Sequence, residues 1–529
     1  MKLSRRRAAV IASALLVGLT VPASPAVAQS HGKHVAKPAA KTPVAKTPAV
    51  RKPVAKKPVA KAVATAAAVT AKTVPTLDSR LAAVKTAKQL NYYPSAAGWS
   101  KMWTNFNATQ IDADMAKASA LGATSVRAII FPTTFGYPQP QTKYTDELAT
   151  FVKLADARGL TVKFTLFDWW DAYSEVANSR NWANRVLRPY ADDPRVISVE
   201  LQNELNVDDA DTMIWAKKIV PLVRADFPTM PLTFSVDGGA GATGMAKIKA
   251  AMAATPIDYY DYHFYGNSER ALALIKQAQA TVAPTPMVIG EVGLNTLQNT
   301  EGEQAAFLAR VFQAATVAGV QSVAPWTLTD FAAGAIPESQ VAKIQAQYNY
   351  GLYRTNGAAK AAAAVVKAAW TGTAMPSTLT DYGFENAAGL TPWRAFMPEL
   401  GLAVKTTSAA HSGKWSVSLT NTGKTTAGSP SYRFSPIAPV QPGQKWHGEV
   451  WAKGNAATGQ SQIAVSWFDI NDKWLGGTSS ASLRTGTTGW TKLTVDGVAP
   501  AGSASMQVHL KSGANTGTVW FDDVVISAS

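Results

Sequence analysis

The body of the chain alternates short apolar runs, rich in β-branched residues, with segments of helical spacing. Eight such runs occur, near 85–92 and at 124–131, 161–167, 196–202, 232–236, 257–263, 286–290 and 321–327. Continuous apolar strands separated by helices indicate parallel pairing with both faces of the sheet covered. Eight strand–helix units within residues 77–370 favour an α/β fold of the closed (β/α)₈ type, the TIM barrel, over an open sheet.

Helical spacing is clearest at 303–318, and an alanine-rich helix is predicted at 358–370. A third helix, at 211–226, contains Pro221, which should kink it because proline lacks an amide hydrogen and crowds the preceding turn. A short polar linker, 371–380, then separates this α/β region from a stretch with a different pattern.

The last part of the chain, residues 381–529, lacks a convincing helical pattern and shows short alternating strands instead. Examples are 415–419, 462–467 and 519–526, with Gly, Ser, Thr and Asn between them. Regular short strands separated by turn residues predict an all-β domain of the jelly-roll or β-sandwich type.

Residues 1–28 have the pattern of a secretory signal peptide. Lys2 and three arginines precede the apolar run 8–21, and Ala26-Val27-Ala28 forms a small-x-small cleavage site. Cleavage before Gln29 is expected, so the mature protein is predicted to be secreted. The alternative is a membrane anchor, but a run of about fourteen residues is short for spanning a bilayer. No later segment is long and apolar enough to span one.

Residues 29–76 form a basic, proline-rich segment that is predicted to be a disordered tether. Proline recurs every fifth residue from Pro38 to Pro58, and each is followed three residues later by Lys or Arg. This spacing prevents helix formation and keeps the cations apart. The segment is either a plain spacer or an element that binds an anionic cell-wall polymer, and both interpretations stay open.

The net charge of +16 belongs almost wholly to this N-terminal part. Residues 1–77 hold 14 Lys or Arg and no acid, which leaves 37 basic against 35 acidic residues in the rest. The remainder is nearly neutral, which argues against a nucleic-acid partner. The chain has no cysteine, so disulfides, thiolate metal sites and cysteine nucleophiles are excluded. It also lacks a His-Glu-x-x-His metal motif, a Gly-x-Ser-x-Gly elbow and a phosphate-binding glycine loop.

Two glutamates stand at the ends of the apolar runs that would form the fourth and seventh strands. Glu204 closes the stretch 196–204, and Glu291 closes 287–291. The parallel strands of a barrel all end at one face, so these carboxyls should meet there. A carboxyl pair at such a mouth is the minimum equipment for glycoside hydrolysis. One carboxyl protonates the leaving oxygen, and the other attacks or stabilises the anomeric carbon.

These residues resemble the retaining glycoside hydrolases with (β/α)₈ barrels, most closely the cellulase and mannanase family numbered five, over roughly 85–335. In that family an asparagine precedes the acid/base glutamate at the end of strand four, which Asn203 and Glu204 match. The family's nucleophile ends strand seven, as Glu291 does, and its charged partner stands where Arg127 lies on strand two. The resemblance implies that Asn203 hydrogen-bonds the sugar 2-hydroxyl.

Further positions fit the same resemblance. His263 and Tyr265, two apart on strand six, should point the same way and stand beside the nucleophile. Trp326 at the end of strand eight would form a platform for a pyranose face, and Trp169 and Trp170 after strand three would add aromatic surface. The family commonly has a histidine near that last position, and this chain does not, so the sugar in the adjoining subsite is not predicted.

The C-terminal part resembles the carbohydrate-binding β-sandwiches that are often attached to such enzymes. The similarity lies in 382–385, 411–418 and the closing 521–523. It implies that Glu385 and Asp523 hold a structural calcium ion through hard oxygen ligands. Five tryptophans are candidates for sugar stacking or for the core, and Trp474 has the neighbours of an exposed loop residue: Trp446, Trp451, Trp467, Trp474 and Trp490.

The sequence therefore predicts a secreted retaining glycosidase that cleaves a polysaccharide of the β-glucan or β-mannan type, with cell-wall association as one of the two open interpretations of the tether. The two-glutamate mechanism needs no cofactor for catalysis. Two alternatives stay open: a non-catalytic glycan-binding protein, and a transglycosylase in which a sugar replaces water at the same site.

Overall fold

In this computed structural model the described residues are 74–376, 378, 383–386, 392–396, 401–421, 431–434, 437 and 439–528. The predicted signal peptide and all but the last three residues of the predicted tether lie outside them. No helix among the described residues is both long and apolar enough to cross a bilayer.

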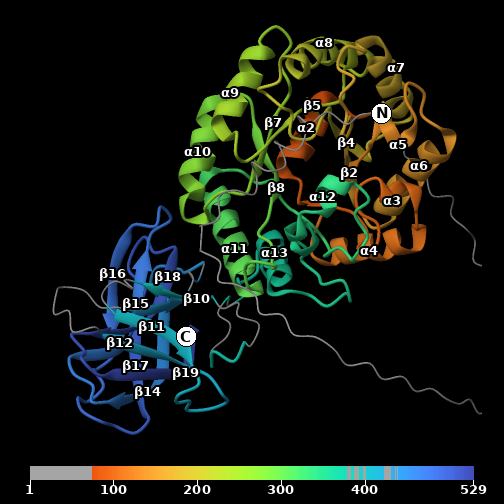
Figure 1. Ribbon diagram of the computed structural model, residues 1–529. Helices are drawn as coiled ribbons and strands as arrows, with labels where there is room; N and C mark the ends of the chain where they lie inside the picture. Colours follow the sequence, from red (N-terminus) through yellow and green to blue (C-terminus); the bar gives the residue numbers. More distant parts are fainter. Residues whose placement is uncertain are drawn as a thin grey trace, which may run out of the picture. The chain divides into compact units, whose positions relative to one another are not determined.

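The first described domain is built on parallel strands at each of the eight predicted places (Figure 1). The strands are β1 (Gln89–Asn91), β2 (Ser125–Ile129), β3 (Thr161–Thr165), β4 (Val196–Glu200), β5 (Leu232–Thr233), β6 (Ser235–Val236), β7 (Tyr260–Phe264), β8 (Met287–Val292) and β9 (Val323–Pro325). They pair in the orders β1-β2-β3-β4-β5 and β6-β7-β8-β9. The predicted strand 232–236 is present as β5 and β6, which are separated only by Phe234.

The sequence predicts one continuous closed barrel, but the described strands form two separate hydrogen-bonded sheets. Among the described strands, no ladder joins β9 to β1 or β5 to β6. Side chains hold the β9–β1 seam instead: Asn91 Nδ2 donates to the Pro325 carbonyl (3.3 Å), and Thr327 Oγ1 donates to the Asn91 carbonyl (2.8 Å). A backbone bond from the Leu328 N–H to the Asn91 carbonyl (3.3 Å) adds to them, and the two sheets meet there without a regular ladder.

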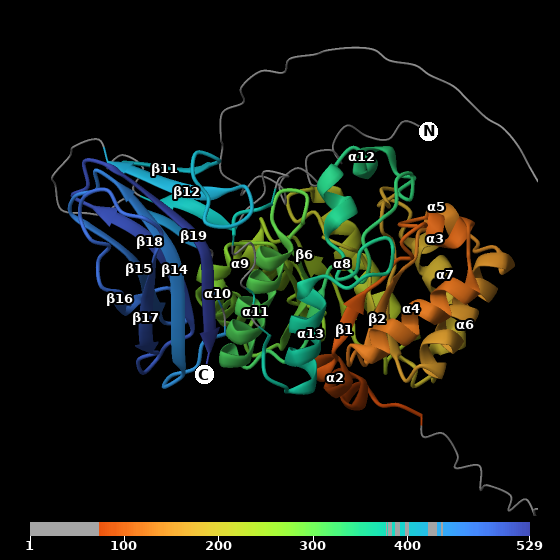
Figure 2. The same cartoon turned by 90° about the horizontal axis from the view of Figure 1, so that it is seen from below.

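Helices enclose these strands in both views (Figures 1 and 2). They are α2 (Leu77–Thr86), α3 (Lys101–Thr104), α4 (Ala108–Ala120), α5 (Pro132–Phe135), α6 (Thr142–Ala157), α7 (Val176–Leu187), α8 (Ala210–Asp226), α9 (Gly241–Ala251), α10 (Ala271–Val282), α11 (Glu301–Ala318), α12 (Ser339–Ala342) and α13 (Ala361–Thr371). Short 3₁₀ turns occur at 188–190, 268–270 and 345–349. With both faces covered, β2, β4, β7 and β8 are buried along their whole length.

The helix ends follow local rules. A capping box between Thr300 and Glu303 starts α11, and Gly319, at φ +77°, ends it in the left-handed region that glycine adopts without strain. The predicted helix around 211–226 is α8, which continues through Pro221 from Ala210 to Asp226. The proline therefore costs an intrahelical hydrogen bond without ending the helix.

The C-terminal part forms a second, all-β domain. Its strands are β10 (Trp393–Phe396), β11 (Gly401–Thr406), β12 (Ser416–Asn421), β13 (Ser431–Phe434), β14 (Lys445–Asn455), β15 (Gln460–Phe468), β16 (Trp474–Ser479), β17 (Thr491–Val498), β18 (Ser505–Gly513) and β19 (Thr518–Ala528). They make two antiparallel five-stranded sheets, β10-β13-β18-β15-β16 and β11-β12-β19-β14-β17.

One hydrophobic core lies between these two sheets. It combines Val450 of β14 and Phe521 of β19 with Ile463 of β15 and Val508 of β18. Burial alternates residue by residue along β14, as expected for a strand with one face on a core. No helix occurs among the described residues of this domain, in agreement with the sequence.

Candidate active site

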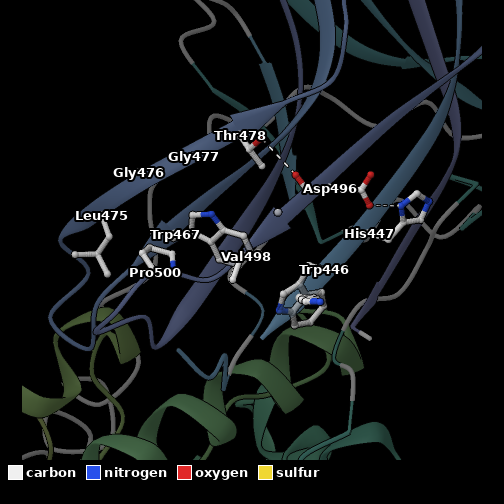
Figure 3. Close-up of a pocket in the computed structure, with 12 residues that line it drawn as sticks. Trp446, His447, Trp467, Leu475, Gly476, Gly477, Thr478, Asp496, Val498 and Pro500 are labelled. Carbon is white, nitrogen blue, oxygen red and sulfur yellow. Dashed lines mark hydrogen bonds and ion pairs between the residues drawn. The ribbon is translucent and has the colours of Figure 1, made fainter. Parts of the chain in front are cut away.

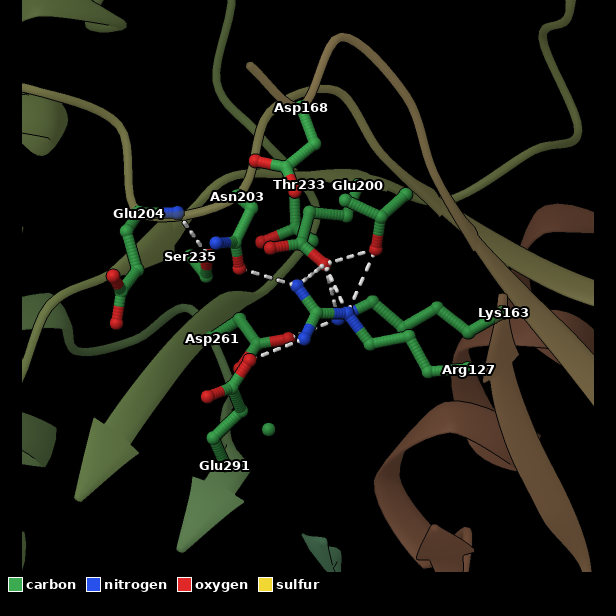
Figure 4. A network of polar contacts seen from close by, with 12 residues as sticks. Arg127, Lys163, Asp168, Glu200, Asn203, Glu204, Thr233, Ser235, Asp261 and Glu291 are labelled. Carbon is green, nitrogen blue, oxygen red and sulfur yellow. Dashed lines mark hydrogen bonds and ion pairs between the residues drawn. The ribbon is translucent and has the colours of Figure 1, made fainter. Parts of the chain in front are cut away.

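A fully buried arginine connects the ends of two strands of the α/β domain (Figure 4). Arg127, at the centre of β2, donates from Nη1 to Glu291 Oε1 (2.5 Å) and from Nη2 to Asn203 Oδ1 (2.6 Å). Its Nε donates to Glu200 Oε2 (2.9 Å). Burial works against the charge of Arg127, but the carboxylates of Glu200 and Glu291 outweigh it and raise the arginine pKa. This guanidinium thereby ties the chain beyond β4 to β8.

The two predicted glutamates are brought together at this edge. The Glu291 side chain, within β8, is 8% exposed, and that of Glu204, four residues beyond β4, is 21% exposed. Glu204 has φ +43° and donates its backbone N–H to Ser235 Oγ (2.6 Å), which turns the chain back over the strand ends. One carboxylate oxygen of each glutamate and a ring nitrogen of His263 all lie within 4.8 Å of one another.

Donors hold both oxygens of Glu291. Besides the bond from Arg127 to Oε1, Tyr265 Oη donates to Oε2 (2.7 Å). His263 Nδ1 lies 3.0 Å from Glu204 Oε1 and 3.5 Å from Glu291 Oε2. Burial lowers the pKa of His263, but the charge of Glu291 and the hydrogen bond with Glu204 outweigh burial and raise it to about 9. These carboxylates therefore favour the protonated form of the imidazole.

Three buried charges that the sequence reasoning did not single out lie beside Arg127. Lys163 Nζ contacts Asp261 Oδ2 and lies 3.0 Å from Glu200 Oε2. Burial alone would raise the pKa of Glu200, but Arg127 and Lys163 overcome it and lower that pKa. A sequence signal did exist, because each of these charges interrupts an apolar strand that is covered on both faces.

The predicted aromatic residues are mostly packed. Trp326 is 7% exposed, and its ring lies edge-on to Trp99 at 5.7 Å between centroids. Trp170 is 5% exposed and packs on Tyr137 at 4.1 Å. Of the pair after β3, only Trp169 is partly exposed, at φ +56°. It is therefore the member of this pair with surface to offer a ligand.

In the C-terminal domain, Glu385 and Asp523 both contact the loop 411–415. Glu385 accepts two backbone N–H groups of that loop (2.9 and 2.8 Å), while Asp523 accepts from His411 Nδ1 (2.6 Å) and Ser412 Oγ (2.7 Å). Each of these carboxylates thus accepts hydrogen bonds from the loop and keeps further oxygen lone pairs, the kind of ligand that calcium prefers, and calcium binding stays a prediction.

The same domain has a cleft of about 570 Å³ (Figure 3). Among its lining residues are Trp446, Trp467, Gly476, Gly477, Thr478 and Gly497. A Cβ at Gly497 would lie 3.0 Å from the Trp467 ring, so glycine is required for the close approach of that indole. Polar groups reach the cleft as well, where His447 Nδ1 bonds Asp496 Oδ1 (2.7 Å). Trp474, 61% exposed, begins the adjoining strand β16.

No family model matches the chain, and no curated protein matches it. Among solved structures it is similar to the exo-β-1,4-mannosidase Op5Man5 from Opitutaceae bacterium strain TAV5, with 18% identity and a TM-score of 0.46 over 54% of this chain and 59% of that chain. A GH5_18 protein from Streptomyces cattleya, in complex with GlcNAc, matches with 18% identity and a TM-score of 0.45 over 55% and 82%.

A GH2 β-galacturonidase from Eisenbergiella tayi, bound to galacturonate, matches with 14% identity and a TM-score of 0.43 over 55% of this chain and 51% of that chain. This chain thus spans less than two thirds of the mannosidase and of the galacturonidase. With TM-scores below 0.5, these likenesses carry no argument about activity, and function has to be inferred from the side-chain geometry.

Proposed function

We propose that this protein is a retaining glycoside hydrolase that cleaves β-glycosidic bonds in a polysaccharide of the glucan or mannan type. The carrying observation is a carboxylate, Glu291, whose two oxygens are both held by donors, with an oxygen of Glu204 within 4.8 Å. In retaining enzymes the two carboxyls are about 5–5.5 Å apart, whereas inversion needs about 6.5–9.5 Å to admit a water. An oxygen pair this close favours the shorter, retaining spacing, in which a carboxylate attacks directly.

In the first half-reaction, Glu291 attacks the anomeric carbon while the bond to the leaving oxygen breaks and Glu204 gives that oxygen its proton. In the second, Glu204 takes a proton from water, whose oxygen displaces Glu291 from the sugar. Hydrogen bonds from Arg127 and Tyr265 hold both oxygens of the nucleophile in place. Because Asn203 Oδ1 accepts from Arg127, its amide nitrogen is left to donate to the sugar 2-hydroxyl.

A polysaccharide panel of β-mannan, β-glucan and xylan, with product anomers followed by NMR, tests this proposal. We expect hydrolysis with net retention, and its loss in Glu291→Gln. The matched control is Glu301→Gln, which removes a carboxylate from an exposed ion pair with Arg354. Inverted products, or full activity in Glu291→Gln, would refute the mechanism.

Added sugar acceptors separate hydrolysis from transglycosylation, because only the latter moves glycosyl groups onto them in preference to water. Binding of a polysaccharide without any turnover would instead favour the non-catalytic alternative.

We further propose that the C-terminal domain holds the same polymer in its cleft. Support comes from the size of the cleft and from its polar pair His447–Asp496, while the indoles of Trp446 and Trp467 in its lining are largely packed in the core. Thr478→Arg should fill the cleft and weaken retention on insoluble glycan. Ser479→Arg adds the same charge and bulk at the next, exposed position of β16 and should leave retention unchanged. Equal retention by the two variants would argue against the cleft.

The signal-peptide pattern and the basic tether support a secreted protein that associates with an anionic cell wall. N-terminal sequencing of secreted material should begin at Gln29. Retention of the leader in protein recovered from membranes would favour the anchor instead.

A further inference from the structure

Below the two glutamates, the interior of the α/β domain holds charges that the proposed hydrolysis does not use. Lys163, Glu200 and Asp261 are all buried, and they connect to each other and to Arg127. Charges are rarely buried in protein interiors unless they are paired, and a paired set need not add stability. Stability alone therefore does not explain why these charges are buried beside the proposed active site.

Asp261 has the geometry to act on the site. It lies two residues before His263 on β7, so both side chains point to the same side of the strand. Lys163 anchors Asp261 Oδ2, whereas Asp261 Oδ1 lies 3.9 Å from His263 Nε2. Neither of these two atoms has a hydrogen-bond partner among the described residues.

The adjoining strand makes room for this carboxylate. A Cβ at Gly290 would fall 1.8 Å from Asp261 Oδ1, so any larger residue there would expel the carboxylate. Gly290 directly precedes Glu291 on β8. The same backbone that carries the proposed nucleophile thus leaves the space through which Asp261 approaches His263.

His263 in turn lies between Asp261 and the proposed acid. Its Nε2 faces Asp261, and its Nδ1 is 3.0 Å from Glu204 Oε1. One proton on the line between Nδ1 and Oε1 can belong to either group, so the imidazole and Glu204 hold it as a pair. The other charged groups around the ring are Glu291, 3.5 Å from Nδ1, and Glu200, Arg127 and Lys163 of the adjoining network.

We propose that Asp261 is a positioning residue for the reaction. It keeps a proton on His263 Nε2 and thereby lets the His263–Glu204 pair retain the proton that Glu204 delivers to the leaving oxygen. This inference rests on the proposed function of Glu204 as the acid. The proton leaves the pair when the glycosidic bond breaks, and the pair recovers it when Glu204 deprotonates the attacking water.

A pH dependence follows from this role. At high pH the His263–Glu204 pair loses its shared proton, which sets the alkaline limb of activity. Asp261→Asn keeps the shape of the side chain but removes its negative charge and leaves Lys163 without that counter-ion. Both changes disfavour the cationic imidazole. Since a charge at about 4–6 Å shifts a pKa by about one to three units, the alkaline limb should move down by about one unit or more.

The test compares kcat/KM across pH for the wild type and Asp261→Asn on an aryl β-glycoside with a poor leaving group. The matched control is Ser198→Ala, a buried polar change on β4 that removes only the acceptor of the Tyr259 hydroxyl. We expect Asp261→Asn to lose its alkaline activity at lower pH and Ser198→Ala to follow the wild type. An unmoved alkaline limb in Asp261→Asn overturns the inference.

A second measurement does not depend on activity. The imidazole of His263 can be titrated by NMR, with its signal assigned by its absence in His263→Gln, and its pKa should fall in Asp261→Asn. An unchanged His263 pKa overturns the inference, whereas a wild type that hydrolyses no glycoside overturns the proposed function instead. If Asp261→Asn does not fold, the Lys163→Met/Asp261→Asn double variant removes both charges. Its His263 pKa is compared with that of Lys163→Met alone: the pKa should be lower in the double variant, and equal values overturn the role of Asp261.

Discussion

The stability of the α/β domain should fall as the pH rises from neutrality, because of one buried imidazole. His263 has its pKa raised to about 9 from the ordinary 6.5, since the carboxylates around it outweigh the effect of burial. A group whose pKa is raised on folding contributes stability that is complete below its unfolded pKa and is lost as the pH passes its folded pKa. The window of this effect therefore runs from about pH 6.5 to about pH 9.

The size of the effect follows from the same two values. Each pKa unit corresponds to about 1.4 kcal/mol, so the shift of His263 amounts to about 3 kcal/mol of unfolding free energy. Within the window the native protein binds one proton more than the unfolded chain, which gives a slope of about −1.4 kcal/mol per pH unit. The ring is fully buried, so solvent screening does not reduce this figure much. A domain with a stability of about 5–15 kcal/mol would show such a loss clearly.

Urea unfolding followed by tryptophan fluorescence at several pH values between about 6 and 10 measures this slope. His263→Gln cannot take up the proton, so its stability should vary much less with pH over this window. His447 serves as the control, because its pKa is also raised by Asp496 and Glu449, but its side chain is 39% exposed. Screening by water should make the effect of His447→Gln on the slope small.

Two results would refute this reasoning. One is a wild-type protein that loses less than about 1 kcal/mol across the window, since a proton held by His263 must then be released at much lower pH. The other is a slope in His263→Gln equal to that of the wild type, which would assign the pH dependence to other groups.

Further outcomes are expected from the same geometry. Glu291→Ala should lose about 10³-fold or more in turnover, about 4 kcal/mol of barrier, while its circular dichroism stays native. Glu204→Ala should still cleave substrates with good leaving groups, and azide should speed release of the intermediate; normal rates on polysaccharide would contradict its role as acid. If Glu385 and Asp523 hold calcium, a chelator should lower the melting temperature. An unchanged melting temperature would argue against a calcium ion at these residues. Deletion of 31–76 should spare catalysis but weaken retention on acidic polymers. Retention of the full-length protein should itself fall as salt rises from about 0.05 to 0.5 M.

Much of the architecture could be read from local sequence patterns. Each predicted strand of the α/β region has a counterpart, because β-branched apolar runs and helical spacing report on the chain's own neighbours. The closeness of Glu204 and Glu291 also follows from a general rule, since parallel strands bring their carboxyl ends to one edge. The edge at which a strand ends can be predicted without knowing which strand it pairs with.

The contacts among the interior charges could not be obtained in that way. Lys163, Glu200 and Asp261 are isolated charges in three separate strands, and their meeting depends on strand register and on the space left at Gly290. The packing of Trp326 and the side-chain seam between β9 and β1 depend on the tertiary structure in the same way.

The sequence by itself therefore determined the succession of strands and helices and the edge at which the two glutamates meet. Only the tertiary structure decided that His263 lies between Glu204 and Asp261, and that Arg127 also binds the buried Glu200. The physical reason is the range of the interactions. Backbone preferences act over a few residues, whereas the energy of a buried charge depends on distances between atoms that the chain separates by tens of residues or more.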